Sequence, residues 1–336
     1  MTSRRAVSAF VTLAAALLLA ATGARGRAAI GPHPLPLAHA TYTTLDYPGA
    51  YQTAAWGVNR TGFMQRTIEV VGVFSVHEGT YGFLYSNGHY TRIDVPDSYD
   101  TYPFAINGHG EVVGTYIGKG GAICPFSWTN GVYARQNLAG DHCMAGGDYQ
   151  TFGIDNAGTV VGVYDNPAAA AFEGFVQTAT GRFTTVKSSE LYGIADNAQL
   201  VGLTIDASGN YHGMRYSSPT ASGIPFDVPG AADTVPHGIN SAGVITGAYG
   251  PFHGVGYPDE TYPGEQGFID ANGTFTRLDY PGATATGANG INDAVAAITA
   301  GPGSGAGFDV VGLYQAANGA VHGFLATIGP KSAGNA

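Results

Sequence analysis

Short apolar stretches separated by turn residues recur along most of the chain. Each repeat contains a small residue, Ile-Asn or a close variant, a turn, and then Val-Val-Gly or a variant of it. Short apolar runs bounded by Gly, Asn and Asp are typical of β-strands, and no long helical periodicity interrupts them. The isoleucine position of the motif recurs at intervals of 48, 48, 40, 45 and 52 residues. It is occupied by Val58, Ile106, Ile154, Ile194, Ile239 and Ile291.

Two further segments complete the repeat. The first resembles Gly-Phe-Leu, and the second resembles Thr-x-Leu-Asp-Tyr-Pro-Gly, as at 276–282. The sixth repeat stops at Ile328 without the second segment, whereas a copy of that segment stands near the start of the chain, at 43–49. A linear array would not explain this displacement. In a closed ring, the first strand of the chain would complete the last repeat. Repeats of about 40 to 50 residues are typical of β-propellers. The sequence therefore predicts an all-β, six-bladed propeller over 40–328, closed by 41–47.

The fifth repeat shows how four strands fit one blade. The pattern predicts an inner strand at 235–240, a returning strand at 244–249, a third strand at 266–270 and an outer strand at 274–279. Asn272-Gly273 separates the last two, and this residue pair is favoured in two-residue β-hairpins. The repeat length thus predicts four-stranded blades.

Glycine, aspartate and asparagine recur at fixed places in the repeats. Glycine in mid-strand, as at Gly72 and Gly247, indicates either a close approach between blades or a β-bulge. The aspartate before Pro-Gly, as at Asp46 and Asp227, is interpreted as a turn residue that hydrogen-bonds the backbone of its own corner. The asparagine of Ile-Asn, as at Asn107, is likewise interpreted as a turn former.

The ends of the chain differ from the repeats. Residues 1–29 have the pattern of a signal peptide, with two arginines, a short Ala-rich apolar stretch and small residues near 22–24. An uncleaved membrane anchor is the alternative, which the short apolar stretch disfavours. We expect a secreted or periplasmic protein with no membrane contact after signal removal. The segment 30–39 is expected to be a linker and 329–336 a flexible tail.

Bulk composition supports a strand-and-turn protein and argues against several functions. Charged residues are only 11% of the chain, while 52 glycines, 20 tyrosines and 16 phenylalanines suit tight turns and packed sheets. The net charge of -10 argues against a nucleic-acid partner, because phosphate binding needs clustered Lys and Arg. The chain has no Gly-x-Ser-x-Gly elbow, P-loop, His-Glu-x-x-His or Asp-rich calcium loop. The sequence therefore predicts no cofactor and no metal site.

A His-Gly-Phe-like triplet follows the Val-Gly strand in two repeats, as His322-Gly323-Phe324 and His212-Gly213-Met214. Together with 238–243 and 278–282, these triplets resemble the bacterial extracellular HAF repeat, which is named for a His-Ala-Phe-like triplet. The resemblance extends over nearly all of 40–328 and implies an exported protein with β-propeller-like repeats. It implies no catalytic residue set. The triplet histidine is replaced elsewhere by Tyr81, Cys124, Glu173 and Gln266.

The chain has two cysteines, Cys124 and Cys143. An exported protein with two cysteines most simply forms one disulfide, so the sequence predicts a Cys124–Cys143 bond. Two separate free thiols are the alternative. A bond would hold the segment 140–142 over the mouth of the channel and stabilise the fold by roughly 2–4 kcal/mol.

Propeller topology separates the loops into two faces. Connections from an outer strand to the next inner strand share one face with the connections from second to third strands; we call this the upper face. Variable loops on a rigid scaffold commonly carry function, so the upper face is the predicted binding surface. Its expected loops are long and irregular, and include 97–103, 117–123, 139–150, 165–172 and 250–265.

One position of the inner strand, directly before its small residue, is aromatic in four repeats and polar in two. A polar side chain that replaces packed aromatic surface needs a hydrogen-bond partner or a ligand. His237 and Asn289 are the polar exceptions, and a structural pair bonded within the core is the alternative to a ligand site. The aromatic residues at this position are Trp56, Phe104, Phe152 and Tyr192.

The longest upper-face loop belongs to the same repeat as His237. A histidine and carboxylates beside a channel mouth suit sugar binding, cation binding or general acid–base chemistry. We therefore predict one ligand site at this mouth. Its residues are His237, Asn289, His253, Asp259, Glu260 and Tyr262, with His142 opposite them.

Three functions fit these observations. The first is a secreted, monomeric propeller that binds a carbohydrate or a cell-surface ligand through its upper-face loops. The second is a secreted glycan hydrolase or lyase with its site at the channel mouth, since propellers host both roles. The third is an extracellular spacer. One asymmetric site favours an enzyme or a single-ligand receptor, but residue spacing does not identify the ligand.

Overall fold

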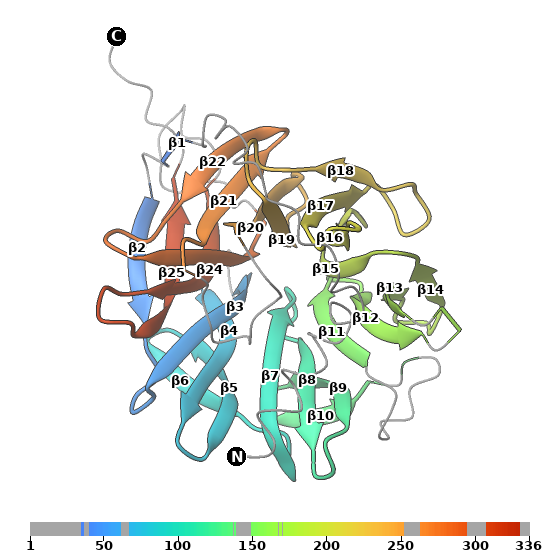
Figure 1. The fold of residues 1–336 in the computed structure, drawn as a ribbon. Coiled ribbons are helices and arrows are strands. Elements are labelled where there is room, and N and C mark those ends of the chain that lie inside the picture. The colour runs from blue at the N-terminus through green and yellow to red at the C-terminus, as the bar shows by residue number, and fades with distance from the viewer. Residues whose placement is uncertain are drawn as a thin grey trace, which may run out of the picture.

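The computed structural model describes residues 35–36, 40–61, 67–136, 138, 149–166, 168–169, 171–251, 263–293 and 307–329. All regular structure in these residues is β. The strands form three four-stranded antiparallel sheets, a five-stranded sheet and an eight-stranded sheet that combines the first and sixth repeats, and these sheets are arranged around a central axis (Figure 1). The architecture is therefore all-β and propeller-like. The described part of the chain contains no helix that could span a membrane.

The strands follow the sequence repeats, and the first strand of each repeat lies nearest the axis (Figure 1). Repeats one and two contain β3 (Gln52–Thr61), β4 (Thr67–Val76), β5 (Gly79–Ser86), β6 (His89–Ile93), β7 (Ser98–Ile106), β8 (Val112–Gly118), β9 (Ile123–Thr129) and β10 (Val132–Arg135). Repeats three and four contain β11 (Tyr149–Ile154), β12 (Val160–Asn166), β13 (Ala171–Gln177), β14 (Phe183–Val186), β15 (Glu190–Ile194), β16 (Leu200–Ile205), β17 (Tyr211–Tyr216) and β18 (Ile224–Phe226). Repeats five and six contain β19 (Asp233–Ile239), β20 (Val244–Gly250), β21 (Gln266–Ala271), β22 (Thr274–Leu278), β23 (Ala285–Ile291), β24 (Phe308–Gln315) and β25 (Val321–Ile328).

The fourth strand of the sixth repeat comes from the start of the chain. Strand β2 (Ala40–Leu45) pairs antiparallel with β25, from Ala40 opposite Ile328 to Leu45 opposite Gly323. The outer edge of β22 carries a further two-residue parallel strand, β1 (Leu35–Pro36), within the segment expected to be a linker. Each inner strand contacts the next one, and β23 contacts β3.

Most predicted strands agree with the structure. In the fifth repeat the observed ends of β19 to β22 lie within two residues of those predicted. Asn272 and Gly273 both have positive φ, as their hairpin turn requires. The expected upper-face loop at 97–103 is wrong, because β7 already begins at Ser98 and continues through this segment. The loop expected at 117–123 is likewise shortened, since β8 ends at Gly118.

A β-bulge explains the small residues of the motif. Each inner strand shifts register at the same place, for example between Ala55 and Gly57, and this leaves Trp56 as the extra residue. Gly72 lies opposite the bulge, where a Cβ atom would be 2.1 Å from the Ala54 carbonyl oxygen. The ring of Phe83, from the Gly-Phe-Leu segment, lies over the same glycine. Of the two interpretations of the mid-strand glycines, the bulge is therefore the observed one.

A second set of glycines brings neighbouring inner strands into contact. A Cβ atom on Gly57 would lie 2.8 Å from Ala105 Cα of the second repeat. At the junction of the sixth and first repeats, a Cβ atom on Gly290 would lie 2.4 Å from the carbonyl oxygen of Trp56. These distances are too short for a large side chain, so this position takes a small residue, which is glycine in five repeats and Ala105 in the second.

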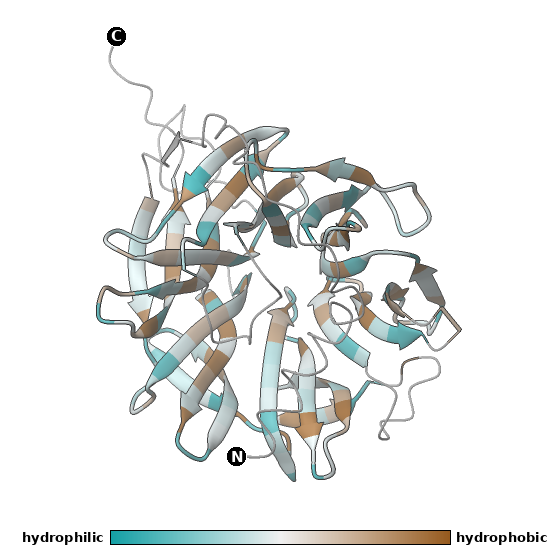
Figure 2. Ribbon diagram, in the orientation of Figure 1, coloured by the Kyte–Doolittle hydropathy of each residue, from teal (hydrophilic) through white to brown (hydrophobic). Residues whose placement is uncertain are grey.

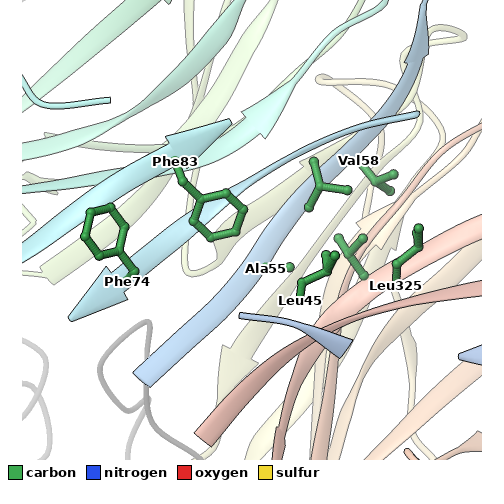
Figure 3. Close-up of a cluster of buried hydrophobic side chains, with 8 residues drawn as sticks. Leu45, Ala55, Val58, Phe74, Phe83 and Leu325 are labelled. Carbon is green, nitrogen blue, oxygen red and sulfur yellow. The ribbon is translucent and has the colours of Figure 1, made fainter. Parts of the chain in front are cut away.

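Apolar side chains fill the space between adjacent sheets. Many strands have runs of consecutive buried residues, as in β4 and β24, because both faces of a sheet pack against neighbouring sheets. Figure 2 shows the hydropathy of the strands on the fold. Figure 3 shows one cluster, in which Leu45 of β2 and Leu325 of β25 pack near Ala55 of β3, close to Phe74 and Phe83. The N-terminal strand thus contributes to the core as well as to the sheet.

The first and sixth repeats also share an ion pair. Arg60 donates to both carboxylate oxygens of Asp309, at 2.6 and 2.9 Å. Asp309 is fully buried and accepts further hydrogen bonds from Asn292 Nδ2 and Thr327 Oγ1. A buried carboxylate with four donors is well compensated.

The turn interpretation holds for Asn107 and Asn240, whereas Asn292 bonds Asp309, and it is wrong for the aspartates. Asn107 Oδ1 accepts from two backbone amides of its own turn, as predicted. Asp227 instead reaches the third strand of its sheet, where it accepts from the Gly213 amide and contacts His212 Nδ1 at 2.9 Å. The corner amide is satisfied by a threonine hydroxyl, as in the bond from Val228 N to Thr234 Oγ1.

Candidate functional site

The bulges direct one side chain from each repeat into the centre of the molecule. Five of the six form a closed ring of aromatic contacts with centroid distances of 5.0 to 5.8 Å. The contacts run through Trp56, Phe104, Phe152, Tyr192 and His237, and Trp56 and His237 meet each other across the smaller Asn289. The ring position singled out in the sequence is therefore the bulge position.

The ring borders an axial cavity of about 80 Å³. The rest of its wall consists of the small residues and the aliphatic residues that follow them in the inner strands. The aliphatic layer comprises Val58, Ile106, Ile154, Ile194, Ile239 and Ile291. A cavity of this size has room for several water molecules or for one small group of a ligand.

His237 brings one unsatisfied acceptor to this cavity. Its imidazole forms a hydrogen bond with the Ala288 carbonyl of the next repeat. Because Nδ1 has no hydrogen-bond partner, this bond belongs to Nε2, and Nδ1 is left as an acceptor. Burial lowers the pKa of His237 to about 4, so the ring is neutral near pH 7.

Asn289 brings a second unsatisfied acceptor. Its Nδ2 donates to the Ala55 carbonyl of the first repeat at 2.9 Å, which fixes the orientation of the amide. The side-chain oxygen Oδ1 then has no partner, although the residue is only 1% exposed. Both polar exceptions therefore join neighbouring repeats, as the structural alternative predicts, and each still leaves one buried acceptor unpaired.

Sequence reasoning missed a carboxylate beside the ring. Glu190 accepts a 2.7 Å hydrogen bond from the Tyr192 hydroxyl, and burial raises the pKa of this carboxyl. An alignment of the inner strands could have found Glu190, because it is the only charged residue at the position two residues before the bulge. The other repeats have Ala54, Tyr102, Gln150, Val235 and Gly287 there.

A wider vestibule of about 550 Å³ lies on the other side of the aliphatic layer, at the face opposite the upper loops. Its polar wall includes Arg60, His109, Asn156, Asp196 and Asp293. Several of these groups already bond to each other across repeats, for example Asn156 N to Asp196 Oδ1 at 2.7 Å. The vestibule wall therefore serves first to hold the repeats together.

Several predicted site residues lie outside the described part of the chain. They are His142, His253, Asp259, Glu260 and Tyr262. Cys143 also lies outside it; the described residues contain no free cysteine, and the Cys124–Cys143 pairing stays a prediction. Where side chains are described, no three His, Cys, Asp or Glu residues are placed to hold a metal ion.

The described site can accept hydrogen bonds but is poorly equipped to move protons. His237 Nδ1 and Asn289 Oδ1 both accept, and none of the carboxylates that the structure describes lines the axial cavity. A histidine with a pKa near 4 is a weak base at neutral pH. The arrangement therefore suits a group that donates hydrogen bonds, such as a hydroxyl.

Comparison with known proteins adds no family. No protein-family model matches the chain, and no curated protein matches it. Solved structures with similar folds include a subtype N11 neuraminidase-like protein of A/flat-faced bat/Peru, at 9% identity and TM-score 0.45, covering 90% of this chain and 98% of that one. They also include a mutant of AofleA from Arthrobotrys oligospora, at 10% identity and TM-score 0.46, covering 85% and 86%. TolB from Acinetobacter baumannii has 10% identity and TM-score 0.45, covering 85% and 65%.

Proposed function

We propose that the protein is an exported, closed six-bladed β-propeller of the HAF-repeat kind that binds a carbohydrate or a cell-surface ligand. Three contacts between the ends of the array support closure. Strand β2 pairs with β25, Gly290 lies against the Trp56 carbonyl, and Arg60 pairs with Asp309. The Cys124–Cys143 bond and a secreted or periplasmic location remain part of this proposal.

The unpaired acceptors of His237 and Asn289 carry the binding proposal. Two acceptors without a protein donor face one cavity that is large enough for water, so a ligand that displaces this water must donate hydrogen bonds to them. Sugar hydroxyl groups are such donors, and the aromatic ring beside them offers apolar surface for a sugar carbon skeleton. The upper-face loops would supply the rest of the binding surface.

Binding is favoured over glycan cleavage by the state of the titratable groups. Canonical glycosidases need two carboxyl groups across the scissile bond. Glu190 is one carboxyl with a raised pKa near the ring, and this observation keeps a glycan-cleaving enzyme as the second candidate. Glu190 does not line the axial cavity, and no other carboxyl group of the described residues lines it.

A glycan array, read together with reducing-end release from pooled polysaccharides, tests both candidates. We expect the wild-type protein to bind at least one glycan class and to release no reducing ends. His237→Phe should weaken binding about tenfold or more, as expected for losing one buried acceptor. The matched control is His89→Phe, at an exposed histidine of β6.

The outcomes separate the candidates. Binding that His237→Phe leaves unchanged would exclude the axial site. Release of reducing ends that is lost in Glu190→Gln would replace the binding proposal with the enzyme. A thermal melt of each variant shows whether the fold is intact.

A further inference from the structure

Two exposed tyrosines lie on the upper face, one in the first repeat and one in the second. Tyr51 is 44% exposed and Tyr99 is 51% exposed, although large apolar or aromatic side chains are mostly buried in the described residues. Both lie five residues before the bulge position of their inner strands, Trp56 and Phe104. The same position therefore presents an aromatic side chain in two adjacent repeats.

The turn between β4 and β5 contacts the Tyr51 ring and the Tyr99 backbone. The Tyr51 ring lies 5.9 Å from the His77 ring, with 33° between their planes. Two residues further on, the backbone at Gly79 lies against Tyr99, since a Cβ atom there would be 3.2 Å from the Tyr99 carbonyl oxygen. Glu78, between them, is exposed. We call Tyr51, His77, Glu78 and Tyr99 the tyrosine platform.

The backbone at Tyr99 forms a second β-bulge. Strand β7 has a second register shift, between Ser98 and Asp100, which leaves Tyr99 as the extra residue. Bulges commonly re-aim a side chain near a functional site. Asp100 fixes the neighbouring turn by accepting from the Thr80 amide at 2.9 Å.

We infer that the tyrosine platform binds the pyranose faces of a neutral polysaccharide. This inference rests on the proposed carbohydrate-binding function and adds a second contact away from the axis. Tyrosine rings offer flat apolar surface that matches the C–H face of a pyranose, and the Glu78 carboxylate and His77 imidazole can bond its hydroxyl groups. A net charge of -10 disfavours acidic polysaccharides, which leaves neutral ones.

Native affinity electrophoresis tests this surface with stated probes. The gels contain laminarin, arabinoxylan or galactomannan as neutral polysaccharides, and alginate or polygalacturonate as acidic ones. We expect one or more neutral polysaccharides to retard the full-length protein, with no retardation by the acidic ones. Tyr51→Ala and Tyr99→Ala should each weaken retardation about tenfold, as expected for losing one aromatic contact, and the double variant should abolish it.

Matched controls exist on the same molecule. Val132 and Ile224 are 69% and 54% exposed but lie on outer strands, so Val132→Ala and Ile224→Ala should be retarded like the wild type. Tyr51→Phe keeps the ring and should also bind. Circular dichroism and melting of the alanine variants should match the wild type, because both side chains are exposed.

The results distinguish this inference from the proposed function. Retardation that is unchanged in the double alanine variant overturns the platform while leaving carbohydrate binding intact. Retardation by the acidic polysaccharides alone also overturns it. If no polysaccharide retards the wild type but the glycan array is positive, the platform fails and the axial site remains. Failure of both assays ends both proposals.

Discussion

The fifth and sixth repeats each contain four antiparallel strands in the same order, but the chain connects these strands differently. In the fifth, the outer strand β22 follows β21 through the Asn272-Gly273 turn and is held by five residue pairs. In the sixth, the equivalent outer strand is β2, which has no covalent turn to β25 and is held by six residue pairs. We call the β2–β25 pairing the seam.

Side chains reinforce the seam where the turn is missing. The Thr44 hydroxyl lies 2.7 Å from the Tyr280 hydroxyl and 3.2 Å from that of Tyr314. The Tyr42 ring packs edge-on against Tyr280 at 5.4 Å. The comparison shows that non-covalent contacts hold the outer strand of the sixth repeat where the fifth repeat has a hairpin turn.

Deletion of residues 40–50 should have the largest effect of any change considered. It removes the outer strand of the sixth repeat, exposes the β25 edge and opens the core at Leu45. We expect a loss of more than about 5 kcal/mol in the free energy of unfolding, comparable to the whole stability of a small domain. Urea unfolding and sedimentation measure the loss and any aggregation.

Deletion of residues 1–34 is the control, because it keeps β1 and β2. A deletion of 40–50 that unfolds at the same urea concentration as this control would show that the seam carries no stability.

A matched pair of leucines compares the seam with the hairpin directly. Leu45 lies opposite Gly323 in the sixth repeat, and Leu278 lies opposite Gly267 in the fifth; both are buried. Leu278→Ala should cost about 3 kcal/mol, as for other buried leucines. Leu45→Ala should cost more, since the untethered strand can detach from the sheet. Equal losses in urea unfolding would mean that the missing turn has no energetic consequence.

The contact between the fifth and sixth repeats should be sensitive to acid through His237. Its folded pKa of about 4 lies below the ordinary value of 6.5, so the unfolded chain binds a proton first as pH falls. The fold should lose up to about 3 kcal/mol between pH 6.5 and pH 4 from this group alone. His237→Phe should be near wild type at pH 7 and increasingly more stable than wild type below pH 6. The difference between the two urea curves at each pH isolates this group, and a constant difference would contradict the shift.

The sequence predicted the repeats, most of the strands and the pairing of 41–47 with the sixth repeat, which the structure shows over 40–45. Each of these depends on a local pattern that recurs in register. It also located His237 and Asn289. Comparison of the repeats alone shows that these two residues are polar at a position that is aromatic in the other four repeats. It did not predict which of their atoms stay unpaired. That depends on the carbonyls of Ala288 and Ala55, which belong to other repeats. The role of Asp227 was missed for a similar reason, since its partners lie on the adjacent strand.

The smallest expected effect concerns two histidine–aspartate pairs, one within a repeat of continuous chain and one at the seam. His212 and Asp227 lie in the fourth repeat, whose strands follow one another along the chain, whereas His322 and Asp46 connect β25 to the segment after β2. The Asp227 carboxylate is the main cause that raises the pKa of His212.

A histidine whose pKa is higher in the folded than in the unfolded protein stabilises the fold. This stabilisation is fully present at a pH below the unfolded pKa and is lost as the pH rises through the folded pKa. The His212 side chain is more than one-third exposed, so solvent screening keeps the contribution below about 1 kcal/mol. Asp227→Asn should therefore destabilise slightly at pH 5.5 and very little at pH 8, as measured by urea unfolding at both values. Asp46→Asn should destabilise more than Asp227→Asn at either pH, because it also loosens the end of the seam. Equal effects of the two substitutions would show that the His322–Asp46 pair does not stabilise the seam, which would then depend on its backbone pairing and buried side chains alone.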